Sequence, residues 1–469
     1  MQEEKKQLRG TNTIAAISTP FGTSGIGIVR MSGPEAFEIA AGVFKSKKAF
    51  DEIGSHTVTH GKIVDPAEDR MLDDVLLIKM AAPRTFTAED VVEINCHGGI
   101  TVLNNILALL LRQGARAAGP GEFTKRAFMN GRMDLAQAEA VIDLINAKTD
   151  EGSRAAAAQL EGRLSERIRA VRRKLIGLLA HIEAVVEYPE YDIEEVTGDS
   201  VYEGVQTVRR ELVKITEGYE RGRLIREGTT AAIIGKPNAG KSSLLNVLSG
   251  SSRAIVTDIP GTTRDVIEEY INVRGIPVRF LDTAGIRNTD DPVESIGVER
   301  AKKAALEAEL VIVVLDAQTG LLPEDIDIIT SMKGKKRIIL INKTDIAHDH
   351  EIAEMKSQLC QYGDMPLVVA SMNDGTGMEE LLKTIEELFL EGVLDTNNEV
   401  LLTNARHRQL LENALDSLEQ AGAAHRDGLP LDFVTIDIKE SADFLGQITG
   451  ESVSEDVVNE IFARFCIGK

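Results

Sequence analysis

The sequence predicts a multidomain α/β protein: an α+β N-terminal domain, then an all-α helical domain that is interrupted by an inserted α/β domain. Length is the first observation, because 469 residues exceed what one hydrophobic core can organise. The second is a change from short β-like runs (residues 13 to about 100) to helical periodicity (about 134 to 222). The third is the alternation of apolar β-branched runs with helical stretches from about residue 229.

The N-terminal domain is expected to span residues 1–121. Its runs "TIAAIS", "GIGIVRMSG", "DDVLLIKM" and "DVVEINCHGG" are short and rich in β-branched residues, as strands are. Residues 34–45 have the apolar spacing of an amphipathic helix. Strands and a helix within one segment predict a mixed α+β domain.

The helical domain is expected to consist of two separated pieces, residues 122–222 and 384–469. Stretches such as "LAQAEAVIDLINAK" and "RAVRRKLIGLLAHIEAVVE" carry apolar residues at 3.6-residue spacing and no strand signals. Because a helical C-terminal segment must bury its apolar stripe, the second piece is predicted to pack on the first. His181, on an apolar helix, is expected in the core.

The inserted domain, residues 223–383, is predicted to be a parallel sheet with helices on both faces. Its runs "TTAAIIG", "VRFLDTAG", "LVIVVLDA", "RIILINKTD" and "MPLVVAS" are apolar and β-branched. Continuous apolar strands of this kind are buried on both sides, and the intervening helices supply the cover.

Composition narrows the classes of function. The net charge is -21, so the average surface repels nucleic-acid phosphates, and contact with them must come from local patches or from a partner. No secretory signal and no run of about 18 apolar residues is found, so no association with a membrane is expected. Three widely spaced cysteines form neither a disulfide framework nor a zinc pattern, which favours a cytoplasmic protein.

A phosphate-binding loop is predicted where the strand "AAIIG" runs into "KPNAGKSSLLNVL". The order is Gly235, four residues, then Gly240, Lys241 and Ser242. Glycines let such a loop turn its N–H groups and the following helix N-terminus toward phosphate oxygens. Lys241 would reach the β- and γ-phosphates, and the Ser242 hydroxyl would bind Mg²⁺.

Two further motifs follow later apolar strands. Asp282 in "FLDTAG" would hold the water shell of Mg²⁺, and Gly285 would approach the γ-phosphate. The stretch "NKTD" resembles the guanine-recognition motif, in which Asp345 accepts from the N1 and N2 donors of the base while Asn342 supports the loop. An unpaired buried carboxylate would penalise adenine, so the motifs in this order predict a GTPase.

The glutamine that orients water in Ras-type enzymes is replaced here by Ile286. Other groups must therefore assist hydrolysis. Thr263, in the switch segment "SSRAIVTDIPGTTRD", would complete the Mg²⁺ shell, and Asn238 offers a side-chain oxygen beside the phosphates. Glu294 would orient water through a bridge.

The segments "GKPNAGKSSLLN", "VTDIPGTTRD", "DTAGIR", "GEFTKRAF", "DLAQAEAV" and the terminal "FCIGK" closely resemble the MnmE (TrmE) family of tRNA modification GTPases. The resemblance covers essentially the whole chain. It implies a Ras-like P-loop G domain inserted in the helical domain, and an N-terminal domain resembling tetrahydrofolate-dependent aminomethyltransferases. The residues expected at GTP are Asn238, Ala239, Gly240, Lys241, Ser242, Ser243, Thr257, Asp258, Ile259, Pro260, Gly261, Thr262, Thr263, Asp282, Thr283, Ala284, Gly285, Asn342, Lys343, Thr344, Asp345, Ser371 and Met372.

The resemblance also implies that two G domains meet across their nucleotides, with K⁺ in the place of an arginine finger. The implied K⁺ ligands are Asn238, Thr257, Ile259 and Thr262, and the Mg²⁺ ligands are Ser242 and Thr263. Glu294 matches the catalytic glutamate that orients the water through a second water. The sequence departs from the family at Met372, which follows Ser371 where alanine is usual.

For the N-terminal domain, the resemblance implies a folate site and constitutive homodimerisation. The matching positions are Arg30, Glu93, Arg132 and Lys469, and the ligand would be 5-formyl- or 5,10-methylene-tetrahydrofolate. Such charged groups suit the donor edge of a pterin and a glutamate tail. Without the resemblance, each of them would be interpreted as an ordinary surface charge.

Cys466 leaves two interpretations open. It is a catalytic nucleophile or a group near the one-carbon unit, with positive neighbours supplied by Lys469 or Arg464. Alternatively, it is a small apolar residue that packs the last helical turn.

The function implied by the resemblance is that of the GTPase subunit of an enzyme that adds a carboxymethylaminomethyl group to carbon 5 of the wobble uridine of tRNA. The partner would be the flavoprotein MnmG (GidA), which would carry FAD and most of the tRNA contacts, in keeping with the acidity of this chain. The alternative is a stand-alone regulatory or ribosome-assembly GTPase. That alternative explains the nucleotide motifs but leaves residues 1–120 and "FCIGK" without a role.

Overall fold

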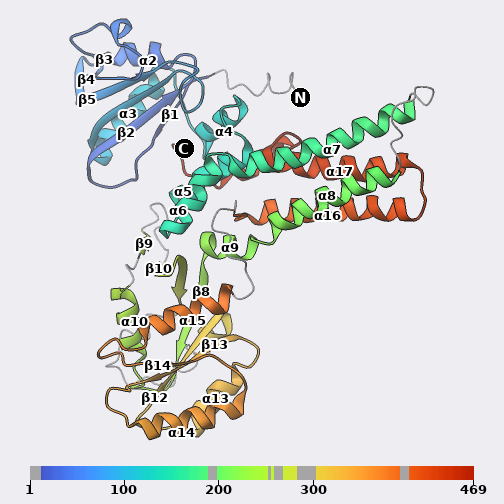
Figure 1. Ribbon diagram of the computed structural model, residues 1–469. Helices are drawn as coiled ribbons and strands as arrows, with labels where there is room; N and C mark the ends of the chain where they lie inside the picture. Colours follow the sequence, from blue (N-terminus) through green and yellow to red (C-terminus); the bar gives the residue numbers. More distant parts are fainter. Residues whose placement is uncertain (1–11, 188–197, 252–254, 258–267, 282–302, 391–400) are drawn as a thin grey trace.

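The computed structural model describes residues 12–187, 198–251, 255–257, 268–281, 303–390 and 401–469 (Figure 1). An N-terminal sheet domain, an elongated helical domain and a second sheet domain follow one another in space. The predicted combination of α+β, all-α and α/β parts is therefore confirmed. None of the helices in these ranges is both long and apolar enough to cross a membrane.

The N-terminal domain is built on a seven-stranded sheet of order β3-β4-β5-β6-β2-β1-β7. Its strands are β1 (Ile14–Ile17), β2 (Ser24–Ser32), β3 (Phe44–Lys45), β4 (Thr57–Asp65), β5 (Arg70–Met80), β6 (Val91–Gly98) and β7 (Arg116–Ala117). Neighbours are antiparallel except for β1 and β7. The helices are α2 (Ala36–Val43), α3 (Ile100–Arg112) and a 3-10 turn (Phe50–Glu52), and α2 and α3 share one core with the sheet.

Four long helices form a bundle that extends away from the N-terminal domain (Figure 1). They are α7 (Arg163–Glu187), α8 (Gly198–Thr216), α16 (Ala405–Arg426) and α17 (Leu431–Thr449). Residues from all four helices share one core, so the C-terminal helices bury their apolar stripe as the sequence predicts. The prediction for His181 is wrong: it is exposed, and the next residue, Ile182, occupies the inward position of α7.

Five shorter helices connect the bundle with the two sheet domains. They are α4 (Glu122–Met129), α5 (Leu135–Ile145), α6 (Asp150–Leu160), α9 (Tyr219–Glu227) and α18 (Glu455–Ala463). The start of α5 is fixed by a capping box, in which the Asp134 carboxylate accepts from the Gln137 N–H at 2.9 Å and the Gln137 side chain accepts from the Asp134 N–H at 3.0 Å.

The second sheet domain also has seven strands, in the order β14-β13-β12-β8-β11-β10-β9. Its elements are β8 (Thr229–Ile234), α10 (Lys241–Ser251), β9 (Ile255–Thr257), β10 (Glu268–Val273), β11 (Ile276–Phe280), β12 (Leu310–Asp316), α13 (Pro323–Ser331), β13 (Lys336–Asn342), α14 (Asp349–Leu359), a 3-10 turn (Cys360–Tyr362), β14 (Leu367–Val369) and α15 (Met378–Leu390). Apolar cores lie on both faces, as predicted.

Six strands of this sheet run in one direction, and β10 alone is antiparallel to its neighbours β11 and β9, which the alternation of strands and helices did not predict. The reason is a tight hairpin between β10 and β11. Arg274 and Gly275 at its turn both have positive φ (48° and 94°), as the two central residues of a type I′ turn require. The core of this domain also includes Leu224, Ile385 and Phe389.

Candidate nucleotide site and docked C-terminal tail

The phosphate loop lies between β8 and α10, at the carboxyl end of a central parallel strand. Gly235, Asn238 and Gly240 all have positive φ (148°, 63° and 102°), so the backbone curls before α10 begins at Lys241. Such a curl directs N–H groups to one point, and the N-terminus of α10 adds its partial positive charge there. The loop therefore suits a polyphosphate.

The ammonium of Lys241 is held inside this loop. Its Nζ donates to the carbonyl oxygens of Gly235 at 2.9 Å and of Lys236 at 2.6 Å. Burial lowers the pKa of Lys241. A partly desolvated cation gains more from a phosphate oxygen than a hydrated one does, so this lysine is placed to bind the anion that the loop suits.

Asn342, at the end of β13, connects the phosphate loop with the loop after β14. Its side-chain Nδ2 donates to the carbonyl of Ala239 at 2.8 Å, and its Oδ1 accepts from the N–H of Met372 at 3.1 Å. The residue is only 2% exposed. A β-carbon on Gly240 would overlap Asn342 Nδ2, so glycine is required for this close approach.

Asp345 lies beside the loop after β14. Its carboxylate accepts from Ser371 Oγ at 2.9 Å and from Asn373 Nδ2 at 3.2 Å. Lys343, in the left-handed region at φ 65°, pairs with Asp316 at 2.6 Å. Asn373 was not among the residues predicted from the sequence for the nucleotide site. Its polar side chain, two positions after Ser371, could have indicated a contact with Asp345.

Met372, the departure from the usual alanine, is accommodated by the core. Its side chain is 8% exposed and packs with the apolar core of the sheet domain. The backbone N–H of Met372 donates to Asn342, and this hydrogen bond does not depend on which side chain residue 372 carries. The substitution therefore leaves the link between the two loops in place.

Part of the predicted nucleotide site lies outside the described residues. These positions are Asp258, Ile259, Pro260, Gly261, Thr262, Thr263, Asp282, Thr283, Ala284, Gly285 and Glu294. Thr257 is the last residue of β9. Ser242 and Ser243 follow Lys241 in the first turn of α10, and Thr344 donates its N–H to the carbonyl of Ala370 at 3.4 Å.

A second charged cluster lies where the end of the chain meets the N-terminal sheet. Arg30 on β2 and Glu93 on β6 are directly opposite each other, and Arg30 Nε donates to Glu93 Oε1 at 2.7 Å. The two side chains are 16% and 17% exposed. Arg30 also donates from Nη1 to the carbonyl of Gly468 at 3.3 Å and lies 5.7 Å from the ring centre of Phe123.

The last residues of the chain are docked by backbone contacts. The N–H of Gly121 donates to the carbonyl of Cys466 at 3.3 Å, and Ile467 forms an antiparallel bridge with Pro120. Ser18 Oγ donates to the Gly468 carbonyl at 3.2 Å. Gly468 has φ 92°, and a β-carbon on it would overlap the carbonyl of Ile17.

Docking places Lys469 in this charged cluster. Burial, and then the Arg30 guanidinium, lower the pKa of Lys469, while Glu93 and Cys466 raise it. The structure thus brings together three of the four predicted folate residues. Arg132 is exposed, and none of the hydrogen bonds and ion pairs among described residues joins its side chain to the other three.

Cys466 is exposed, so the interpretation that it packs the last helical turn is wrong. Phe465, the residue before it, is 6% exposed and takes that role in the core with Phe462. The chemical role of Cys466 stays a prediction.

Comparison with known proteins agrees with this geometry. A family model described as "MnmE helical domain" matches residues 135–466, and one described as "GTP-binding protein TrmE N-terminus" matches residues 13–132. The relatives include proteins named tRNA modification GTPase MnmE from Acetivibrio thermocellus (58% identical), Alkaliphilus oremlandii (48%) and Staphylococcus haemolyticus (45%). Each alignment covers 98% of this chain and 99% of the relative.

Among solved structures, the chain is similar to a single-residue variant of Aquifex aeolicus Era bound to GDP.AlF4-, at 25% identity over 40% of this chain and 66% of that one, with a TM-score of 0.27. That score is too low to define a shared overall fold.

A mostly parallel sheet with a phosphate loop and a guanine-recognition motif at its carboxyl edge defines a GTP-binding protein of the P-loop class. The full-length relatives narrow this class further. The chain belongs to the tRNA modification GTPase MnmE family.

Proposed function

We propose that this chain is a K⁺-dependent GTPase whose cycle drives carboxymethylaminomethyl addition to carbon 5 of the wobble uridine of tRNA, in a complex with the flavoprotein MnmG (GidA). The observation that supports it most is the docking of Gly468 and Lys469 against Arg30 and Glu93. A stand-alone regulatory GTPase has no need of a second polar cluster built from both ends of the chain.

In the nucleotide site, Lys241 and the phosphate loop would hold the phosphates, and Asp345 would read guanine. Mg²⁺, held by Ser242 and Thr263, would supply charge neutralisation at the phosphate oxygens. The proposed K⁺ ligands are Asn238, Thr257, Ile259 and Thr262. Glu294 would orient the attacking water, and dimerisation of two G domains would complete the site.

In the second cluster, Arg30, Glu93 and Lys469 would hold a tetrahydrofolate derivative, with Arg132 contributing from its loop. The group would supply a one-carbon unit. The paired Arg30 and Glu93 offer both a donor and an acceptor to a pterin edge, and Lys469 offers a cation to a carboxylate. Cys466 would lie near the reacting carbon. The chain would act as a homodimer in the cytoplasm, with FAD and most tRNA contacts on the partner.

Deletion of residues 466–469 tests the assignment of the tail. GTP turnover should stay nearly intact, because the nucleotide loops share no contact with the tail among the described residues. The wobble modification should disappear when tRNA nucleosides are analysed by mass spectrometry. Unchanged nucleosides would favour the stand-alone regulatory or ribosome-assembly GTPase.

Exchange of K⁺ for Na⁺ tests the hydrolysis mechanism. If the cation replaces an arginine finger, turnover should fall by roughly 100-fold or more, since such a finger contributes about 10³–10⁵ in other GTPases. Equal rates in the two salts would remove the cation from the mechanism while leaving nucleotide binding untouched.

A further inference from the structure

The joint between the helical domain and the second sheet domain is made by α9 and by the segment that returns before α16. Tyr219, at the start of α9, is buried in the bundle core, whereas Leu224, five residues later, is buried in the sheet-domain core. A β-carbon on Gly222 would overlap the carbonyl of Leu402 in the returning segment. The two crossings between the domains therefore touch.

Helix α5 presents two carboxylates, one turn apart, to these crossings. Glu139 faces the start of α16, and its oxygens accept from Arg406 at 2.7 and 3.0 Å, from His407 at 2.7 Å and from the N-cap residue Asn404 at 3.2 Å. The side chain is 7% exposed. Although burial raises the pKa of Glu139, His407 and Arg406 lower it to about 2. Because Arg406, His407 and Asn404 share this carboxylate, its buried charge is well compensated.

Asp143 faces α9, where the chain leaves the helical domain, and has fewer hydrogen-bond partners than Glu139. One oxygen accepts from Arg226 Nε at 2.8 Å, and the other, Oδ2, is buried without a hydrogen-bond partner among the described residues. Burial raises the pKa of Asp143, and Arg226 only partly opposes this. Arg226 keeps 29% of its side chain exposed, so its guanidinium can be hydrated if the pair separates.

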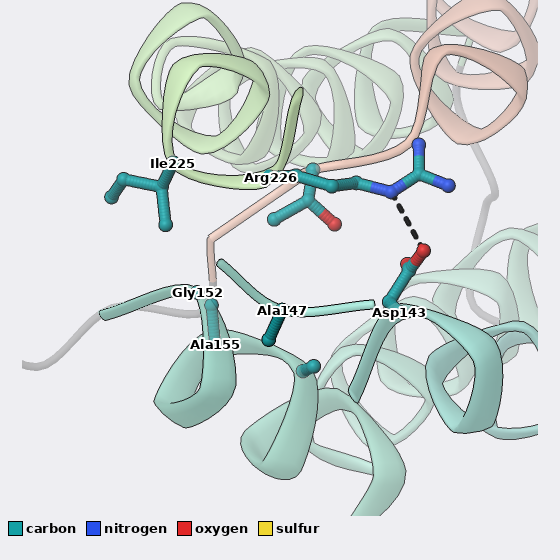
Figure 2. Close-up of a pocket in the computed structure, with 8 residues that line it drawn as sticks. Asp143, Ala147, Gly152, Ala155, Ile225 and Arg226 are labelled. Atoms are coloured by element: carbon teal, nitrogen blue, oxygen red, sulfur yellow. Dashed lines mark hydrogen bonds and ion pairs between the residues drawn. The ribbon is translucent and has the colours of Figure 1, made fainter. Parts of the chain in front are cut away.

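A small pocket beside this pair is lined by residues of both α9 and α6 (Figure 2). Figure 2 shows Arg226 reaching across to Asp143 above Ala147, Gly152 and Ala155. On the α6 side the lining consists of glycine and alanine, and a β-carbon on Gly152 would lie 3.3 Å from the carbonyl of Ile225. Because α6 contributes no long side chain that interlocks with Ile225 and Arg226 of α9, a shift of α9 over α6 has a low packing cost.

We propose that Asp143 and Arg226 are positioning residues that hold the nucleotide-binding domain in this orientation and release it during the GTPase cycle. Glu139, with Arg406 and His407, ties α5 to α16 and so keeps the helical side of the joint fixed. The inference rests on the proposed GTP-driven movement of the G domains. Two further contacts between the domains would hold the same orientation. Lys148 Nζ lies 3.6 Å from the ring centre of Tyr270 on β10, and Glu151 lies against Gly275.

The test measures the distance between the two domains in the full-length chain. Spin labels are placed on Cys360, which is exposed in the sheet domain, and on Gln420→Cys, which is exposed on α16. A Cys466→Ser background removes the other exposed thiol, and Cys96 is buried. Labelled chains are diluted into an excess of unlabelled chains, so that pairs between protomers of a dimer do not contribute.

Arg226→Gln and Asp143→Asn should each broaden the distance distribution without nucleotide, and Arg226→Lys should restore a narrow one. The matched control is Arg223→Gln, which also removes a guanidinium from α9. Among the described residues, the Arg223 guanidinium pairs only with Glu220 and Glu309. This control should match the wild type. Distributions for Arg226→Gln and Asp143→Asn that are indistinguishable from the control would overturn the proposal.

A second readout separates positioning from simple stabilisation. With Arg226→Gln, GTP turnover should be retained while wobble modification falls on the order of tenfold, within the usual range of coupling between sites. If both rates and the melting temperature fall together, as expected for Glu139→Gln, the pair is structural and the proposal is wrong. The distance measurement does not depend on tRNA modification, so it stands even if the proposed function fails.

Discussion

The nucleotide loops and the docked tail are both polar clusters, but they are assembled in different ways. The nucleotide loops follow β8, β13 and β14, parallel strands of one sheet, and Asn342 ties them with two hydrogen bonds. The tail cluster joins Arg30 to Gly468, 438 positions away in the sequence. The first cluster needs one folded domain, whereas the second needs the N-terminal sheet, α4 and α18 to be in place together.

The two clusters also differ in how they are buried. Asn342 is 2% exposed and has both side-chain atoms bonded, so a change there leaves an unsatisfied polar group. The tail is held through its backbone carbonyls, which accept hydrogen bonds at 3.2 to 3.3 Å, and its Ile467 is 59% exposed. A change in the tail should therefore detach it while leaving the rest of the fold intact.

The largest effect is expected from Gly240→Ala. The added β-carbon would overlap Asn342 Nδ2 at φ 102°, so strain and the lost hydrogen bond to Ala239 together cost about 3 kcal/mol. Affinity for GDP, measured by titration calorimetry, should fall roughly 100-fold.

Gly250→Ala, in α10 with open space around the new β-carbon, is the control and should bind normally. At saturating GTP, neither change should alter the rate of wobble modification, which depends on the tail. Normal GDP affinity in Gly240→Ala would mean that the contact between the two loops is not needed for binding.

A smaller effect, confined to the other cluster, is expected from Gly468→Ala. Its β-carbon would overlap the Ile17 carbonyl at φ 92°, which costs about 2 kcal/mol of docking free energy. Wobble modification, measured by nucleoside mass spectrometry, should fall by about 30-fold, and GTP turnover should not change.

Gly428→Ala is the control for Gly468→Ala, because it adds strain at a positive φ without displacing the tail. Gly428 also has positive φ, at 70°, but has open space around it and lies between α16 and α17. It should keep modification near the wild-type rate. Loss of GTP turnover in Gly468→Ala would break the contrast between the two clusters.

The smallest effect is expected from Ser371→Ala. This change removes the 2.9 Å hydrogen bond to Asp345 but leaves the Asn373 contact and the backbone link through Met372. A loss of about 1 kcal/mol corresponds to roughly fivefold weaker GDP binding. A loss as large as that of Gly240→Ala would show that base recognition, and not the phosphate loop, dominates affinity.

The sequence by itself determined the features that local chemistry encodes. The order of Gly235, Gly240 and Lys241, the position of Asn342 at a strand end, and the change from strand to helix texture all follow from spacing along the chain. It also predicted that the C-terminal helices pack on the bundle, because their apolar stripe needs a partner. It misplaced His181, since one residue of helical phase separates an inward position from an exposed one.

The resemblance grouped Arg30 with Lys469 in one site, but only the tertiary structure decided which distant groups are in contact. Arg30 with Gly468, Ser18 with the same carbonyl, and Asp143 with Arg226 leave no spacing signal, because each pair joins elements from different parts of the chain. The sequence also gives no signal that Asp143 Oδ2 is buried without a hydrogen-bond partner among the described residues. Whether a buried carboxylate finds two partners or one depends on how helices pack, and packing is a property of the assembled fold.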